Sequence, residues 1–244
     1  MLKFLNFNQK NSLRKLESIL NVRKSRQQNQ SATVKKILYN VKKNGDEAVI
    51  MYEKKFSNIK NKSKKLQFSK NEINSISKTI DKKLKKSIDT AFTRIKYFHS
   101  KQTYSAFKYR DKYKNELAYK FSPIERVGVY VPGGTASYPS TVLMNCIPAL
   151  VAGVKNIYLT TPAFGTAVNP AVIYAAKKCG VKEIYKTGGA HSIAALAYGT
   201  KTFKKVDKIV GPGNAFVASA KKEVFGEVGI DMVAGPSEVS IVAD

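Results

Sequence analysis

The stretch Val-Gly-Val-Tyr-Val-Pro-Gly-Gly at residues 127–134 decides how this chain is expected to fold. Strand-forming residues run directly into a glycine- and proline-rich loop, and the same order recurs at Gly188-Gly189-Ala190, Gly211-Pro212-Gly213-Asn214 and Ala234-Gly235-Pro236-Ser237. The first three loops lead into apolar helical stretches. This repetition predicts a doubly wound, mostly parallel α/β sheet of Rossmann-like type, with its loops on one edge, where such folds bind anionic or dinucleotide ligands.

The expected elements of this half alternate along the chain. Strands are expected at 127–131, 156–161, 182–186, 206–210, 230–233 and 239–242, and helices at 139–152, 170–179, 190–198 and 214–225. Asn169-Pro170 is a helix-start signal and Gly180 a stop signal.

Composition divides the chain into two regions. Residues 1–120 carry 31 Lys+Arg against 9 Asp+Glu, a surplus of 22, and hold a single glycine, whereas residues 121–244 carry 12 against 8 and the other fourteen glycines. We therefore predict a helical, basic N-terminal region at 1–120 and a Rossmann-like dinucleotide-binding domain at 121–244.

Helical spacing of apolar residues runs through the basic region. Residues 12–55 predict helices, with a cap at Ser31-Ala32-Thr33 and a break at Asn44-Gly45-Asp46. Residues 57–67 are expected to be a connector with little to bury, and 69–102 one long amphipathic helix. Aromatic residues among charges at 103–125 predict an exposed hairpin.

The formal charge of +26 raises the alternative of a basic nucleic-acid-binding protein. Only six of the 43 basic residues are arginine, the residue best suited to bidentate phosphate and guanine contacts, and no nucleic-acid-binding motif is recognisable. A solvated lysine-rich surface is the favoured interpretation, so nucleic acid is not an expected partner.

The two cysteines, Cys146 and Cys179, lie in apolar segments, where they are expected to act as small buried hydrophobes. They do not form a pair at zinc-ligand spacing. The N-terminal residues lack the apolar stretch of a signal peptide, and no run approaches the length of a membrane span. We expect a cytoplasmic protein without a membrane partner.

Polar side chains follow the predicted loops. Tyr130 ends the first strand, His191 follows Gly188-Gly189-Ala190, Asn214 follows a Gly-Pro-Gly turn, and Ser237 and Glu238 follow the last loop. Each has a purely structural alternative: Tyr130 as a core or edge aromatic, His191 and Asn214 as helix caps. Four such loops on one edge favour a ligand crevice.

Five segments of the chain resemble histidinol dehydrogenase. They are 127–134, Ser-Thr-Val-Leu-Met-Asn at 140–145, the Gly-Gly-Ala-His segment at 188–200, Val-Asp-Lys-Ile-Val-Gly-Pro-Gly-Asn at 206–214 and Ile-Asp-Met-Val-Ala-Gly-Pro-Ser-Glu-Val at 230–239. Asn44-Gly45-Asp46-Glu47-Ala48 in the first half is also similar to this family, so the likeness covers essentially the whole chain.

The resemblance implies a two-step, NAD-dependent oxidation of L-histidinol to L-histidine, in a zinc enzyme that forms a homodimer. It implies that Tyr130, His191 and Asn214 contact NAD and that Ser237 contacts the substrate. The family usually has glutamine where this chain has His191, a side chain that still donates a hydrogen bond but with different geometry and a charge that can change.

The family's zinc ligands and its catalytic Glu-His pair are expected beyond Asp244, so no catalytic or metal-binding residue is predicted within the chain. We accordingly expect an N-terminal portion of a longer enzyme, inactive by itself. A relative that oxidises another polar alcohol is the alternative within the family.

Overall fold

The computed structural model describes residues 6, 8, 10–56, 65–133, 138–163 and 168–233, without the side chains of 19–29. Its centre is a five-stranded sheet in the order β5-β4-β3-β6-β7, in which every pairing is parallel. The strands are β3 (Arg126–Tyr130), β4 (Asn156–Thr160), β5 (Glu183–Tyr185), β6 (Lys208–Val210) and β7 (Gly229–Ile230). The strand order reverses at β3, so the carboxyl ends of β3 and β6 border the switch point of the sheet.

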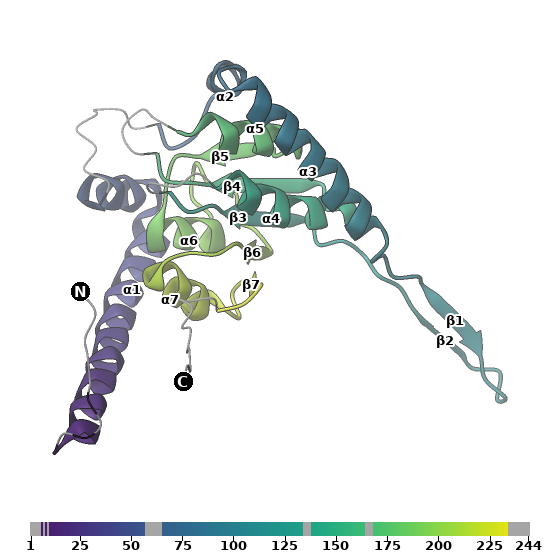
Figure 1. Cartoon of the computed structure of the whole chain (residues 1–244). Helices are drawn as coiled ribbons and strands as arrows, with labels where there is room; N and C mark the ends of the chain where they lie inside the picture. The colour runs from purple at the N-terminus through teal and green to yellow at the C-terminus, as the bar shows by residue number, and fades with distance from the viewer. Residues whose placement is uncertain are drawn as a thin grey trace.

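Helices cover both faces of the sheet, as Figure 1 shows. The helices α4 (Pro139–Val151) and α5 (Pro170–Lys178) lie on one face, and α6 (Gly189–Tyr198) and α7 (Ala215–Val224) on the other. Two hydrophobic clusters result, one on each face, because the strands bury side chains in both directions. The prediction of a doubly wound, mostly parallel α/β fold is confirmed.

The first helix, α1 (Ser12–Phe56), packs against α6 and α7 through Val34, Ile37, Leu38 and Val41. The expected break is present as a kink at Gly45, whose φ is 54°. The expected cap at Ser31-Ala32-Thr33 is wrong, because α1 continues through these residues. The Ser31 hydroxyl instead donates to Glu223 Oε1 at 3.0 Å and ties α1 to α7.

The expected long helix at 69–102 is two helices, α2 (Lys70–Lys78) and α3 (Lys82–Ser100). The prediction of one helix failed because Asp81 begins a new one: its side chain accepts from Leu84 N at 2.9 Å. Both helices still pack their apolar stripes on the α4 and α5 side of the sheet.

The strands β1 (Phe107–Arg110) and β2 (Glu116–Tyr119) pair antiparallel and confirm the expected hairpin, which projects away from the sheet (Figure 1). The expectation of little burial in the connector at 57–67 is wrong at its end. The Leu66 side chain is buried, and the Leu66 carbonyl oxygen accepts from Lys186 N. The strand expected at 239–242 lies outside the described residues. No helix within the described ranges is long and apolar enough to cross a membrane.

Glu72 joins α2 to the end of β5. Its carboxylate accepts from Ser69 N at 2.7 Å, completing a capping box, and from Lys186 Nζ at 2.5 Å. The hydrogen bond from Lys186 is the largest cause of a pKa lowered from 4.5 to about 2.

We expect Glu72→Gln to lower the free energy of unfolding near neutral pH by less than about 1 kcal/mol, because the side chain is partly exposed and glutamine keeps the capping box. A lowered carboxyl pKa stabilises the fold above pH 4.5 and ceases to do so as the pH falls toward 2. Urea unfolding should therefore show the wild-type advantage shrinking across that window. An advantage that grows on acidification would contradict this account, and Glu116→Gln on the exposed hairpin serves as the control.

Candidate functional site

A cavity of about 570 Å³ opens at the carboxyl edge of the sheet. It is bordered by the loop after β3 (130, 132–133), the loop after β5 (188–191), the residues that begin α7 (214, 216), Pro162 after β4, and one side of α1 (30, 33, 37, 56). The cavity thus lies beside the switch point, where open α/β sheets bind their ligands.

A second cavity, of about 590 Å³, lies at the foot of the hairpin. Its lining is mainly apolar and comes from α4, from the segment after β2 and from β3 and β6, for example Phe121, Pro123 and Pro148. None of the predicted site residues that the structure describes borders it. We therefore take the cavity at the carboxyl edge of the sheet, called the loop cavity below, as the candidate site.

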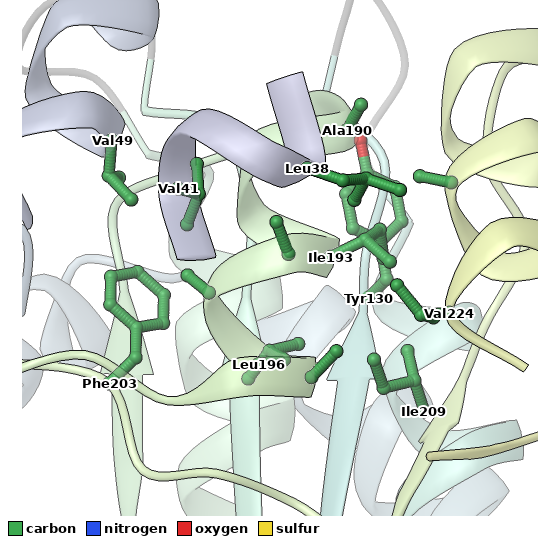
Figure 2. Close-up of a cluster of buried hydrophobic side chains, with 14 of the residues drawn as sticks. Leu38, Val41, Val49, Tyr130, Ala190, Ile193, Leu196, Phe203, Ile209 and Val224 are labelled. Atoms are coloured by element: carbon green, nitrogen blue, oxygen red, sulfur yellow. The ribbon is translucent and has the colours of Figure 1, made fainter. Parts of the chain in front are cut away.

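Tyr130 stands at the end of β3 and is almost fully buried. Its hydroxyl oxygen accepts from Gly189 N at 3.1 Å, and Figure 2 shows the ring in the core beneath Ala190. Burial, with a smaller effect from the Glu53 charge, raises the pKa of the Tyr130 phenol. Tyr130 is therefore both a core aromatic and a protonated O–H group that can donate to a ligand.

His191 lies in the first turn of α6, and its exposed fraction is 2 %. Its Nε2 is 2.9 Å from Glu53 Oε1, and the same oxygen accepts from Gly188 N at 2.8 Å. The rings of Tyr52 and Phe56 lie beside the imidazole, with centroids 5.8 and 6.1 Å away. The Glu53 carboxylate, on α1, thus holds both His191 and the loop that precedes it.

Asn214 caps α7, as its structural alternative predicts. Its Oδ1 accepts from Phe216 N and Val217 N, both at 3.1 Å. Asn214 also borders the loop cavity. Because both capping bonds use Oδ1, the amide N–H groups are the donors that this side chain can offer to a ligand.

The loop after β6 is held by a buried lysine that pairs with a more exposed aspartate. Lys221, in α7, has an exposed fraction of 2 %, donates to Gly211 O at 2.9 Å and pairs with Asp231. Asp231 in turn accepts from Gly211 N at 2.8 Å. Gly211 has a φ of 111° and passes so close to β3 that a Cβ would lie 2.1 Å from Tyr130 O, which excludes any larger residue.

The structure brings Tyr130, His191 and Asn214 to the border of one cavity, although they come from three loops. Ser237 and Glu238 lie outside the described residues. Among the residues that the structure does describe, no group of three or more His, Cys, Asp or Glu side chains could hold a metal ion.

Sequence reasoning missed Glu53, Phe56, Lys221 and Asp231. A weak signal existed for Glu53, since it lies four residues after the buried Val49 and therefore on the apolar face of its helix. Nothing comparable marks Lys221, which follows a run of small and apolar residues and precedes a second lysine.

Residues 20–244 match the protein family described as histidinol dehydrogenase. Among similar proteins, histidinol dehydrogenase of Pelagibacter ubique is 54 % identical over 245 residues, covering all of this chain and 56 % of the relative, and that of Mesorhizobium japonicum is 51 % identical, covering 87 % and 50 %. The crystal structure of histidinol dehydrogenase from Elizabethkingia anophelis matches with a TM-score of 0.79 at 38 % identity, covering 84 % of this chain and 48 % of that one. The chain spans about half the length of the curated relatives it matches.

The Lys221–Asp231 pair yields a stability prediction. Lys221→Met removes a buried cation that bonds to Gly211 O and to Asp231, but the remaining Asp231 carboxylate is open to solvent, so we expect a loss of about 1–3 kcal/mol in the free energy of unfolding. The neighbouring Lys222 is exposed, and Lys222→Met should change stability by less than about 0.5 kcal/mol. Urea denaturation of the two variants measures both values, and equal losses would show that Lys221 has no special part in holding the loop.

Proposed function

Because this chain belongs to the histidinol dehydrogenase family, we propose that its loop cavity binds NAD and that the chain supplies this site to an enzyme oxidising L-histidinol to L-histidine. One observation carries the proposal: Tyr130, His191 and Asn214, from three separate strand–loop–helix units, border one cavity beside the switch point of the sheet. A set of independent helix caps would not need to share a cavity.

The side chains present suit a dinucleotide. The Tyr130 hydroxyl and the Asn214 amide can donate to hydroxyl, carbonyl or phosphate oxygens, and His191 adds a ring nitrogen. Pro132, Pro162 and Phe216 supply apolar surface for a flat ring. When bound, NAD would accept the hydride from the alcohol carbon, while these residues bind and orient it.

The two regions would share this task. We propose that the sheet domain at 121–244 provides the loops and that the basic region at 1–120 supplies a wall through α1, from which Thr33, Ile37 and Phe56 border the cavity. A contact of Ser237 with the substrate, a zinc ion and a homodimer are proposals that rest on the family resemblance. We assign zinc no ligand among the described residues.

Asn214→Asp separates binding from capping. Aspartate keeps the oxygen that accepts from Phe216 N and Val217 N, so α7 should stay capped and the free energy of unfolding should change by less than about 0.5 kcal/mol. It loses the amide donors and adds a negative charge beside an anionic ligand. We expect NAD affinity to fall roughly tenfold or more in calorimetric titration.

Asn169→Asp is the matched control for this substitution. Asn169 caps α5 in the same way, with Oδ1 accepting from Ala171 N at 2.9 Å, and it does not border the loop cavity. NAD affinity should therefore stay at the wild-type value. Equal affinities for wild type and both variants would defeat the assignment of Asn214 to the cofactor.

A further inference from the structure

The hydrogen bond between Glu53 and His191 assigns the two ring nitrogens different roles. An ionised carboxylate can only accept, so the hydrogen of the 2.9 Å contact belongs to His191 Nε2. The bond is enclosed, since the side chains of His191 and Glu53 have exposed fractions of 3 % and 6 %. In a neutral imidazole with a hydrogen on Nε2, Nδ1 carries a lone pair and is an acceptor.

That second nitrogen is an unsatisfied polar atom. His191 Nδ1 is buried and has no hydrogen-bond partner among the residues the structure describes. The edge of the imidazole that carries Nδ1 lies against Gly189, because a Cβ built on this glycine would be 3.5 Å from Nδ1. His191 also borders the loop cavity. Buried polar atoms without partners are uncommon and unfavourable, so this one points to a ligand group, and for a neutral imidazole that group is a donor.

Glu53 also occupies the amino end of α6. Its Oε1 accepts from Gly188 N, the residue that caps this helix. A helix amino terminus is where a phosphate group would otherwise be favoured. In this protein a side-chain carboxylate from α1 takes that place, so the end of the cavity at α6 is poorly suited to a second anion.

We propose that Glu53 is a positioning residue that holds His191 in its Nε2–H form, so that Nδ1 accepts a hydrogen bond from an uncharged donor of the dinucleotide. The donor is a hydroxyl or an amino or amide N–H group, and not the pyrophosphate, whose oxygens only accept. The inference deepens the proposed function and rests on it.

Nitrogen NMR of the chain labelled with ¹⁵N-histidine tests the first half without any ligand. The only other histidine, His99, is partly exposed on α3 and bonds to Gln102, so it is an internal reference. Near neutral pH we expect His191 to show hydrogen on Nε2 alone. The amide introduced by Glu53→Gln can accept or donate, so this variant should raise the fraction of His191 rings with hydrogen on Nδ1. Glu47→Gln changes an exposed site on the same helix and should leave that fraction unchanged. Hydrogen on Nδ1 in the wild type, alone or together with Nε2, would overturn the proposal.

Titration with NAD and, separately, with inorganic pyrophosphate tests the second half. NAD should move the Nδ1 resonance of His191, and pyrophosphate should not. Glu53→Gln should weaken NAD binding roughly three- to tenfold, whereas Glu47→Gln should leave NAD affinity unchanged. An NAD complex in which Nδ1 does not respond, or an equal response to pyrophosphate, would overturn the acceptor role. Absence of NAD binding by the wild type, with hydrogen still on Nε2, would instead refute the proposed function and reduce Glu53 to a structural residue.

Discussion

The parallel pairing of β3 with β4 on one side and with β6 on the other is the constraint on which the rest of the structure depends. The chain leaves β3 through α4, on one face of the sheet, and reaches β6 through α6, on the other face. The two connections therefore separate at the carboxyl end of β3. The carboxyl end of β3 is therefore open to a ligand, and Tyr130 stands at that end. Gly211 brings the loop after β6 directly against Tyr130, and Asn214, which follows in the same loop, borders the loop cavity.

Buried charges brace two of the loops that border this cavity. Glu53 holds the loop after β5 from α1, and Lys221 holds the loop after β6 from α7. In each case the charged group bonds to a backbone atom of a glycine, Gly188 N or Gly211 O, that has no side chain with which to pack. A charge removed from water needs such partners to be tolerated at all. Rigid loops in turn lower the entropy lost when a ligand binds.

The lysine-rich region is a structural part of the molecule as well as a charged surface. The apolar stripes of α1, α2 and α3 pack into the two hydrophobic clusters that sandwich the sheet, and α1 also borders the loop cavity. Its lysines are mostly exposed, for example Lys35, Lys36, Lys42 and Lys43 around the buried Val34, Ile37 and Val41. Helical periodicity explains this arrangement, because one face of α1 is buried and the opposite face is solvated.

The sequence by itself determined the fold class, the succession of strands and helices along the chain, the hairpin and the loops that meet at one edge, because these follow from local patterns of apolar residues, glycine and proline. It also offered a helix cap as one interpretation of Asn214, and the structure shows that cap, which is readable locally because a cap bonds only to the next turn. It could not separate α2 from α3, because the apolar spacing continues across Asp81. Only the tertiary structure decided that His191 faces Glu53, 138 positions away, and that Lys221 is buried against Asp231. Such pairs depend on how α1 and α7 lie on the sheet, and no local pattern records which polar side chain a packed helix will turn inward.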